Sequence, residues 1–190
     1  MQAAIRRKDE AGEIVESDRP RSNDVGTILH RALELFVKYG FTADKATDLA
    51  LTEHSDLAEG EERMRDFIFT CAKAYIEYFH KNGLDQYDAE PEFTFSYHLD
   101  NQINNGSIDL LLIKGDDCII IDYKSDEAEY ILDDKVFEIT LKEKYEPQLN
   151  SYEEVVKHLF PEIKSIKKQI IYFKRYDRNN KQIDVLSYEL

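Results

Sequence analysis

The sequence predicts an α/β fold, a sandwich in which helices flank a central mixed β-sheet. Three stretches with helical spacing come first, then a β-hairpin, then a further helix and two closing strands. Elements in this order bury their apolar sides against one another in layers. A length of 190 residues favours one domain. We expect residues 1–22 to be a flexible lead-in or linker and residues 23–190 to form that domain.

The first three predicted helices cover residues 24–39, about 42–54 and about 60–81. Apolar residues recur at helical spacing along the first and third, and the pattern of the second is weaker. Gly40 ends the first helix, because glycine readily adopts the left-handed conformation that closes a helix. Asn82-Gly83 ends the third.

Strands are predicted in the middle of the chain. Residues 93–99 alternate between apolar and polar side chains and predict a strand, and Asn104-Asn105-Gly106 predicts a turn. Residues 106–124 then form a hairpin around Gly115-Asp116, where glycine at the first position suits a type II′ turn.

The last part of the chain closes the fold. Residues 126–144 are polar and predict a loop or lid. Pro147 is placed to start a helix that runs to about residue 159. Residues 166–173 and 183–188 predict two strands, joined by a turn at Asn179-Asn180.

Polar residues in the hairpin carry the functional argument. With the turn centred at Gly115-Asp116, Asp109 lies directly across from Asp122, and Lys124 shares their face. Side chains opposed in an antiparallel pair have Cβ atoms roughly 4.5–5.5 Å apart. The hairpin therefore gathers two carboxylates and one ammonium group into a single patch.

A divalent metal ion explains this patch best. The apolar run Ile119–Ile121 indicates that both faces of the strand are covered, so the charges beside it are buried. Two like charges in such a place are costly unless a cation compensates them. A metal held by aspartates beside a lysine suits phosphodiester hydrolysis. The alternative is a solvated polar face of an edge hairpin.

Five short motifs resemble a known family. They are Gly26-x-x-x-His30, Glu90-Pro91-Glu92-Phe93, Gly106-x-Ile108-Asp109, Ile121-Asp122-Tyr123-Lys124-Ser125 and Gln148-x-x-x-Tyr152. In this order they resemble the nuclease motifs of the PD-(D/E)XK superfamily. The similarity is greatest to its RecB-like branch, the nuclease domains of bacterial RecB/AddA-type helicase–nucleases that process DNA ends.

The resemblance implies a restriction-endonuclease-like fold and a set of site residues. Asp109 and Asp122 would bind Mg²⁺, for which Mn²⁺ would substitute. The backbone carbonyl of Tyr123 resembles a third oxygen ligand. The histidine that matches His30 contacts the metal in this branch; without the family pattern, His30 reads as an ordinary histidine on a polar helix face. Lys124 would position the attacking water or stabilise charge at the phosphorus, and we favour the charge-stabilising role over that of a general base.

Further positions are expected to support the site. Glu90 is either an outer-sphere acid that holds a metal-bound water or an ordinary loop carboxylate, and Glu92 competes for the same role. Gln148 and Tyr152 share one helical face. The resemblance assigns this pair to bracing the site and touching the DNA backbone, and Tyr152 can equally be a core aromatic.

The resemblance implies DNA and a helicase domain or subunit as partners, and the charge of the chain bears on how it would bind DNA. A net charge of −14 argues against a simple DNA-binding module, because phosphate contacts need lysine and arginine. Residues 161–190 are the exception, with seven basic and four acidic groups. Their cations either line a path for phosphates or form a solvated rim. A nuclease module of a larger machine would receive its strand from the helicase.

Several classes of cofactor and location are not expected. Iron–sulfur members of the branch need four cysteines, and only Cys71 and Cys118 are present. No Gly-x-x-x-x-Gly-Lys-Ser/Thr loop occurs, so no nucleotide is expected in this chain. No stretch approaches the roughly 20 apolar residues of a membrane span, and no signal peptide is visible. We expect a cytoplasmic protein with reduced thiols.

Three classes of function stay open. The favoured one is a metal-dependent exonuclease module of a helicase–nuclease in DNA recombination and repair. The second is a stand-alone endonuclease of the same fold, acting on single-stranded or branched DNA. The third is a catalytically silent partner-binding module, against which the intact set of Asp109, Asp122 and Lys124 argues.

Overall fold

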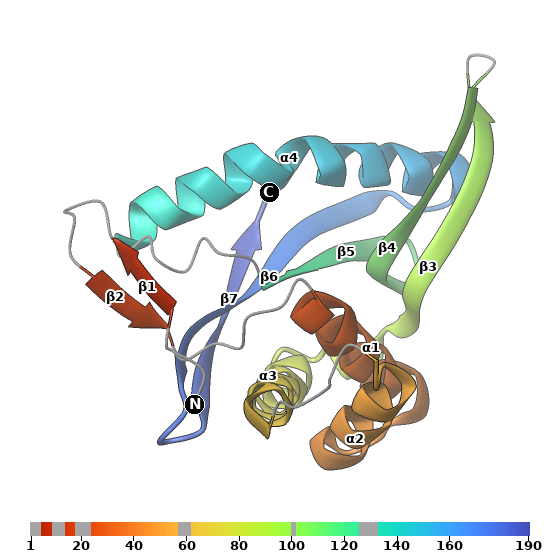
Figure 1. Ribbon diagram of the computed structural model, residues 1–190. Helices are drawn as coiled ribbons and strands as arrows, with labels where there is room; N and C mark the ends of the chain where they lie inside the picture. Colours follow the sequence, from red (N-terminus) through yellow and green to blue (C-terminus); the bar gives the residue numbers. More distant parts are fainter. Residues whose placement is uncertain (1–4, 9–13, 18–23, 57–61, 100–101, 126–132) are drawn as a thin grey trace.

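A five-stranded mixed sheet forms the centre of the molecule, with three helices on one face and one long helix on the other (Figure 1). The computed structural model describes residues 5–8, 14–17, 24–56, 62–99, 102–125 and 133–190. This arrangement confirms the predicted α/β sandwich around a mixed sheet.

The elements follow one another in the predicted general order. The helices are α1 (Asp24–Tyr39), α2 (Ala43–Glu53), α3 (Glu62–Lys81) and α4 (Asp134–Leu159), with a short 3-10 turn, η1, at Leu84–Gln86. The strands of the central sheet are β3 (Asp88–Leu99), β4 (Gln102–Lys114), β5 (Asp117–Lys124), β6 (Ser165–Asp177) and β7 (Gln182–Glu189). Their spatial order is β3-β4-β5-β6-β7. Only β5 and β6 are parallel, and α4 is the crossover that such a pair needs.

Two hydrophobic cores sandwich β5. Ile119 and Ile121 pack with α1, α2 and α3 on one face. Cys118 and Ile120 pack with α4 on the other. Because both faces are covered, β5 is a nearly continuous apolar run, and any charged group at its end enters a buried environment.

The predicted hairpin between β4 and β5 is confirmed. Lys114 pairs with Asp117, and the ladder continues to Leu110 opposite Ile121. Gly115 has a φ of 64°, the conformation that a two-residue hairpin turn requires at its first position. Beyond Leu110, β4 pairs only with β3, so the far ends of these two strands project from the sheet as an arm (Figure 1).

The predicted turn at residues 104–106 is wrong, since these residues lie inside β4. Asn105 pairs with Ser96 and Gly106 with Phe95. Asparagine and glycine favour turns, but here pairing with β3 overrides that preference. The Phe95 ring covers Gly106, and a Cβ there would lie 2.5 Å from Phe95 Cζ.

Within the predicted loop over 126–144, residues 134–144 are helical instead, and the predicted helix start at Pro147 is also wrong. Helix α4 begins at Asp134, where the Asp133 side chain accepts hydrogen bonds from two backbone N–H groups of the first turn. Buried Phe137 and Leu141 anchor its first half on the sheet. Pro147 therefore lies inside the helix, where packing on both sides outweighs the backbone hydrogen bond that proline removes. Residues 126–132 lie outside the described residues.

The segment expected as a lead-in, residues 1–22, includes two short strands. These are β1 (Ile5–Lys8) and β2 (Ile14–Ser17), which pair antiparallel. The division of the chain at residue 22 stays a prediction. Among the helices of the described residues, none is both long and apolar enough to span a bilayer.

Candidate metal centre

The candidate site lies where β4 departs from β5. The ladder stops at Leu110 and Ile121, one step short of the predicted pair of Asp109 with Asp122. Beyond this point, the backbone N–H of Tyr123 donates a hydrogen bond to the side chain of Asp109 instead of to the backbone of β4, and the distance to Oδ2 is 2.7 Å. Asp109 is thereby held beside the end of β5. The charge of Asp109 raises the pKa of Asp122, so the two carboxyl groups are electrostatic neighbours.

Asp122 is the most unusual residue of the site. It is fully buried, and neither carboxylate oxygen receives a hydrogen bond of good geometry from the described residues. Lys124 Nζ lies 2.6 Å from Oδ2, but the direction of approach is poor. Burial, and then the charge of Asp109, raise the pKa of Asp122 to about 6. A buried carboxylate with free lone pairs is a ready ligand for a cation.

Asp109 has a similar electrostatic environment. Burial raises its pKa to about 6, against the opposing effects of the Tyr123 N–H and of Lys124. Both aspartates are thus costly to ionise in the protein alone. A divalent cation beside them would reverse that cost. Among the described residues, the ligand atoms that lie within 4.8 Å of one another belong to His30, Glu92 and Asp109, and Asp122 is not in this group.

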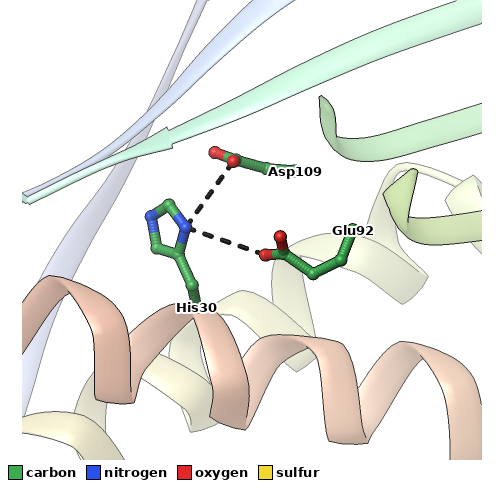
Figure 2. Close-up of side chains that lie close together, drawn as sticks. All are labelled: His30, Glu92 and Asp109. Carbon is green, nitrogen blue, oxygen red and sulfur yellow. Dashed lines mark ion pairs between the residues drawn. The ribbon is translucent and has the colours of Figure 1, made fainter. Parts of the chain in front are cut away.

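His30, on α1, completes one side of the site. Its Nε2 lies 3.2 Å from the carbonyl oxygen of Tyr123. Its Nδ1 lies 3.6 Å from Asp109 Oδ1 and 3.9 Å from Glu92 Oε1, the two contacts marked in Figure 2. Burial lowers the pKa of His30, which favours the neutral ring. With the proton on Nε2, donated to the carbonyl, the Nδ1 lone pair faces the carboxylates, an arrangement typical of metal-binding histidines.

Glu92, rather than Glu90, joins this cluster. Ligand atoms of His30, Glu92 and Asp109 all lie within 4.8 Å of one another. Glu92 has a φ of 50°, unusual for a residue other than glycine, and interrupts its own ladder with β4. Ser107 Oγ donates to Glu92 Oε2 at 3.3 Å, and burial raises the pKa of Glu92. Glu90 is exposed and lies outside the cluster. Strand alternation does not reveal this distortion.

Helix α4 also contributes residues near the site. Gln148 Nε2 donates to the hydroxyl of Tyr152 at 2.7 Å, so the predicted pair does share one helical face. Burial raises the pKa of Tyr152, and the charges of Asp122 and Asp109 add to this effect, so Tyr152 lies within electrostatic reach of the site.

Tyr145 also faces the site, although it was not among the predicted site residues. Lys124 Nζ lies 4.7 Å from the centroid of its ring. The signal was the spacing, since Tyr145 precedes Gln148 by three residues and Tyr152 by seven, which is one helical face. It was overlooked because the helix was predicted to begin at Pro147.

Most of the C-terminal cations are already engaged in ion pairs. Six of the seven form ion pairs with acidic side chains: Lys164 with Asp116, Lys168 with Glu153, Lys174 and Arg175 with Asp134, and Arg178 and Lys181 with Asp66. Lys174 is in addition buried. Because these cations are already paired, the structure favours a solvated rim over a path for DNA phosphates in this region.

The fold and the donor set together define a class. An α/β sandwich that brings carboxylates, an imidazole and a lysine to the end of a central strand is suited to a hard divalent cation and an anionic substrate. Comparison with protein families makes the class specific. The chain belongs to the PD-(D/E)XK nuclease superfamily, whose family model matches residues 2–189. Nucleases of this superfamily generally use divalent metal ions, and the nuclease fold implies DNA binding.

Other comparisons add little. No curated protein matches the chain significantly. Among solved structures, the crystal structure of SSO0001 is similar, with 15% sequence identity over 89% of this chain and 78% of that chain. The TM-score is 0.31, so the structural likeness is weak.

Proposed function

We propose that this chain hydrolyses phosphodiester bonds in DNA with Mg²⁺, and that Mn²⁺ substitutes for it. The observation that carries the proposal is Asp122, a buried carboxylate beside Asp109. Among the described residues, its Oδ1 has no hydrogen-bond partner and its Oδ2 has only the ion pair with Lys124. A structural aspartate in such a place would be fully hydrogen-bonded.

The proposed ligands come from three elements. Asp109, Asp122 and the Nδ1 atom of His30 would hold the cation, and the Tyr123 carbonyl has a second lone pair free for it beyond the contact with His30. When bound, such a cation lowers the pKa of a coordinated water and neutralises charge on the phosphate. Glu92 would orient water on the His30 side.

Lys124 has a separate proposed role. Its ammonium group lies at the edge of the site, 2.6 Å from Asp122 and partly exposed. From there it would stabilise the negative charge that develops on the phosphoryl oxygens in the transition state. We do not assign it the role of a general base, because its ammonium group is held in an ion pair with Asp122.

Nuclease activity is tested directly. The purified chain is incubated with linear single-stranded DNA and Mg²⁺ or Mn²⁺, with EDTA and Asp122→Asn as controls. We expect cleavage by the wild type only, and only with metal. Equal cleavage by Asp122→Asn would reject the proposed centre, whereas absence of cleavage by the wild type on every DNA form would leave the silent binding module.

We further propose that the chain is an exonuclease module of a RecB-like helicase–nuclease that processes DNA ends. The five motifs in order support this, as does a histidine on the first helix whose Nδ1 faces the carboxylates. The paired state of the C-terminal cations supports delivery of the strand by another domain or subunit.

Two substrates separate the alternatives. Degradation of linear but not closed circular single strands supports the exonuclease, and degradation of both supports the endonuclease. If a motor must supply the strand, the isolated chain should cleave single-stranded overhangs and leave blunt duplex ends intact. Rapid digestion of blunt duplexes by the chain alone would argue against a helicase partner.

A further inference from the structure

Helix α4 places an aromatic ring against the lysine of the site. Lys124 Nζ lies 4.7 Å from the centroid of the Tyr145 ring and 2.6 Å from Asp122 Oδ2. The ring is half-buried, and Lys144 Nζ lies 4.9 Å from the same centroid. Both ammonium groups are within the roughly 6 Å at which the ring quadrupole attracts a cation.

Binding of a cation would affect the contacts of Lys124 with Asp122 and with Tyr145 differently. Asp122 is a proposed metal ligand, so its negative charge cannot serve Lys124 in full once it is shared. Tyr145 carries no formal charge and does not compete for a metal. Its ring can therefore keep an ammonium group in place whether or not Asp122 is engaged, at little cost in rotamer freedom because α4 fixes its backbone.

We propose that Tyr145 is a positioning residue, which holds the ammonium group of Lys124 at the site through its ring face while Asp122 is engaged elsewhere. The inference rests on the proposed nuclease function. The ring face is the functional part, so the hydroxyl is dispensable and an aliphatic side chain of similar size is no substitute.

The kinetic experiment uses a graded series at position 145. Tyr145→Phe should retain wild-type cleavage, Tyr145→Trp should retain most of it, and Tyr145→Leu should lose about tenfold in kcat with little change in KM. The metal concentration for half-maximal activity should not move. Lys144→Met is the matched control, because it removes the exposed cation from the same ring and should leave kcat unchanged.

Several outcomes would overturn the inference. Equal kcat for Tyr145→Leu and wild type means that the ring does not position Lys124. Equal losses for Tyr145→Phe and Tyr145→Leu mean that the hydroxyl acts. A rise in KM alone means that Tyr145 contacts DNA instead. An inactive wild type would reject the proposed function on which the inference rests, and this result is distinct from the outcomes above, all of which require an active wild type.

A spectroscopic readout tests the contact without activity, and so decides if Tyr145→Leu fails to fold. The chain contains no tryptophan, so Tyr145→Trp introduces a single indole. In metal-free buffer, adding Lys124→Met to Tyr145→Trp should change the emission of that indole, because an ammonium group leaves its face. Identical spectra for the two proteins would show that position 145 does not contact Lys124 and would overturn the inference.

Discussion

Asp122 makes little sense as a structural residue. It lies near the end of β5 among buried apolar residues, and it receives no well-aligned hydrogen bond from the described part of the chain. An amide or aliphatic side chain would fill the same space without the cost of a buried charge. The residue is therefore explained by the cation that we propose it binds. Without metal, its buried charge should lower the stability of the protein.

The first prediction concerns this loss of stability. Asp122→Asn should raise the melting temperature of the protein in EDTA at pH 7.5, because it removes a buried charge that Asp109 also repels. The gain should be on the order of 1 kcal/mol, or about 2–4 °C for a chain of this size. Addition of Mg²⁺ should stabilise the wild type and not the variant. A lower melting temperature for the variant in EDTA would contradict the account.

A pH dependence follows from the same two groups. The pKa values of Asp109 and Asp122 are each raised to about 6, so the native state binds more protons than the unfolded state between roughly pH 4 and pH 6. Their contribution to stability is thus lost as pH rises through this window. In EDTA, the stability advantage of Asp109→Asn/Asp122→Asn over wild type should shrink from pH 7.5 to pH 5. A constant difference would count against the raised pKa values.

Lys124 should be separable from metal binding. Lys124→Met is expected to reduce kcat by roughly 10²–10³-fold, the usual effect of removing one group that stabilises transition-state charge. Stabilisation by Mg²⁺ should remain, because the ligands are intact. Thermal melts with and without metal, alongside the cleavage assay, check both halves. Loss of the metal effect as well would mean that the role of Lys124 is misassigned.

For single residues, the sequence indicates which side chains belong to the site better than it indicates how they are arranged. Asp109, Asp122 and Lys124 were found from strand register alone, and His30 from a family pattern. Glu92 was only a competitor to Glu90, because its positive φ depends on how β3 crosses the departing β4. Whether these residues bind metal or act in catalysis stays a prediction.

Elements with one dominant local signal were predicted well. Helix α1 has the predicted bounds, and the β4–β5 turn falls at Gly115-Asp116, because helical periodicity and a glycine turn are each local features. Helix α4 was truncated, since a proline inside a helix is tolerated only when packing on both sides supports it. That packing involves the distant strand β6 and is invisible in the local pattern.

The arm formed by β3 and β4 offers a test of its own. Gly106→Ala should destabilise the protein by about 1–3 kcal/mol, because the new Cβ would lie 2.5 Å from Phe95 Cζ. Thermal or urea unfolding measures the effect, and adding Phe95→Leu should relieve part of it. The matched control is Gly26→Ala, where the nearest atom is Ser125 Oγ at 3.7 Å, an ordinary contact. Equal effects of the two alanines would contradict the proposed crowding.

At the scale of the whole molecule, the separation of β4 from β5 determines where the candidate site lies. Two cores enclose β5, and β4 leaves it just as both strands reach their charged residues. Helix α1 closes this opening from one face with His30, and α4 from the other with Tyr145 and Tyr152. The layer order was predictable from the sequence, whereas the convergence of these helices on the opening depends on tertiary packing.

The most direct test of the account is calorimetric titration of Mn²⁺ into the metal-free protein at pH 7.5. We predict saturable binding by the wild type and by Lys124→Met, and a loss of at least tenfold in affinity for Asp122→Asn, which removes one charged ligand. Binding of equal strength to wild type and Asp122→Asn would contradict the claim that this buried carboxylate holds the metal.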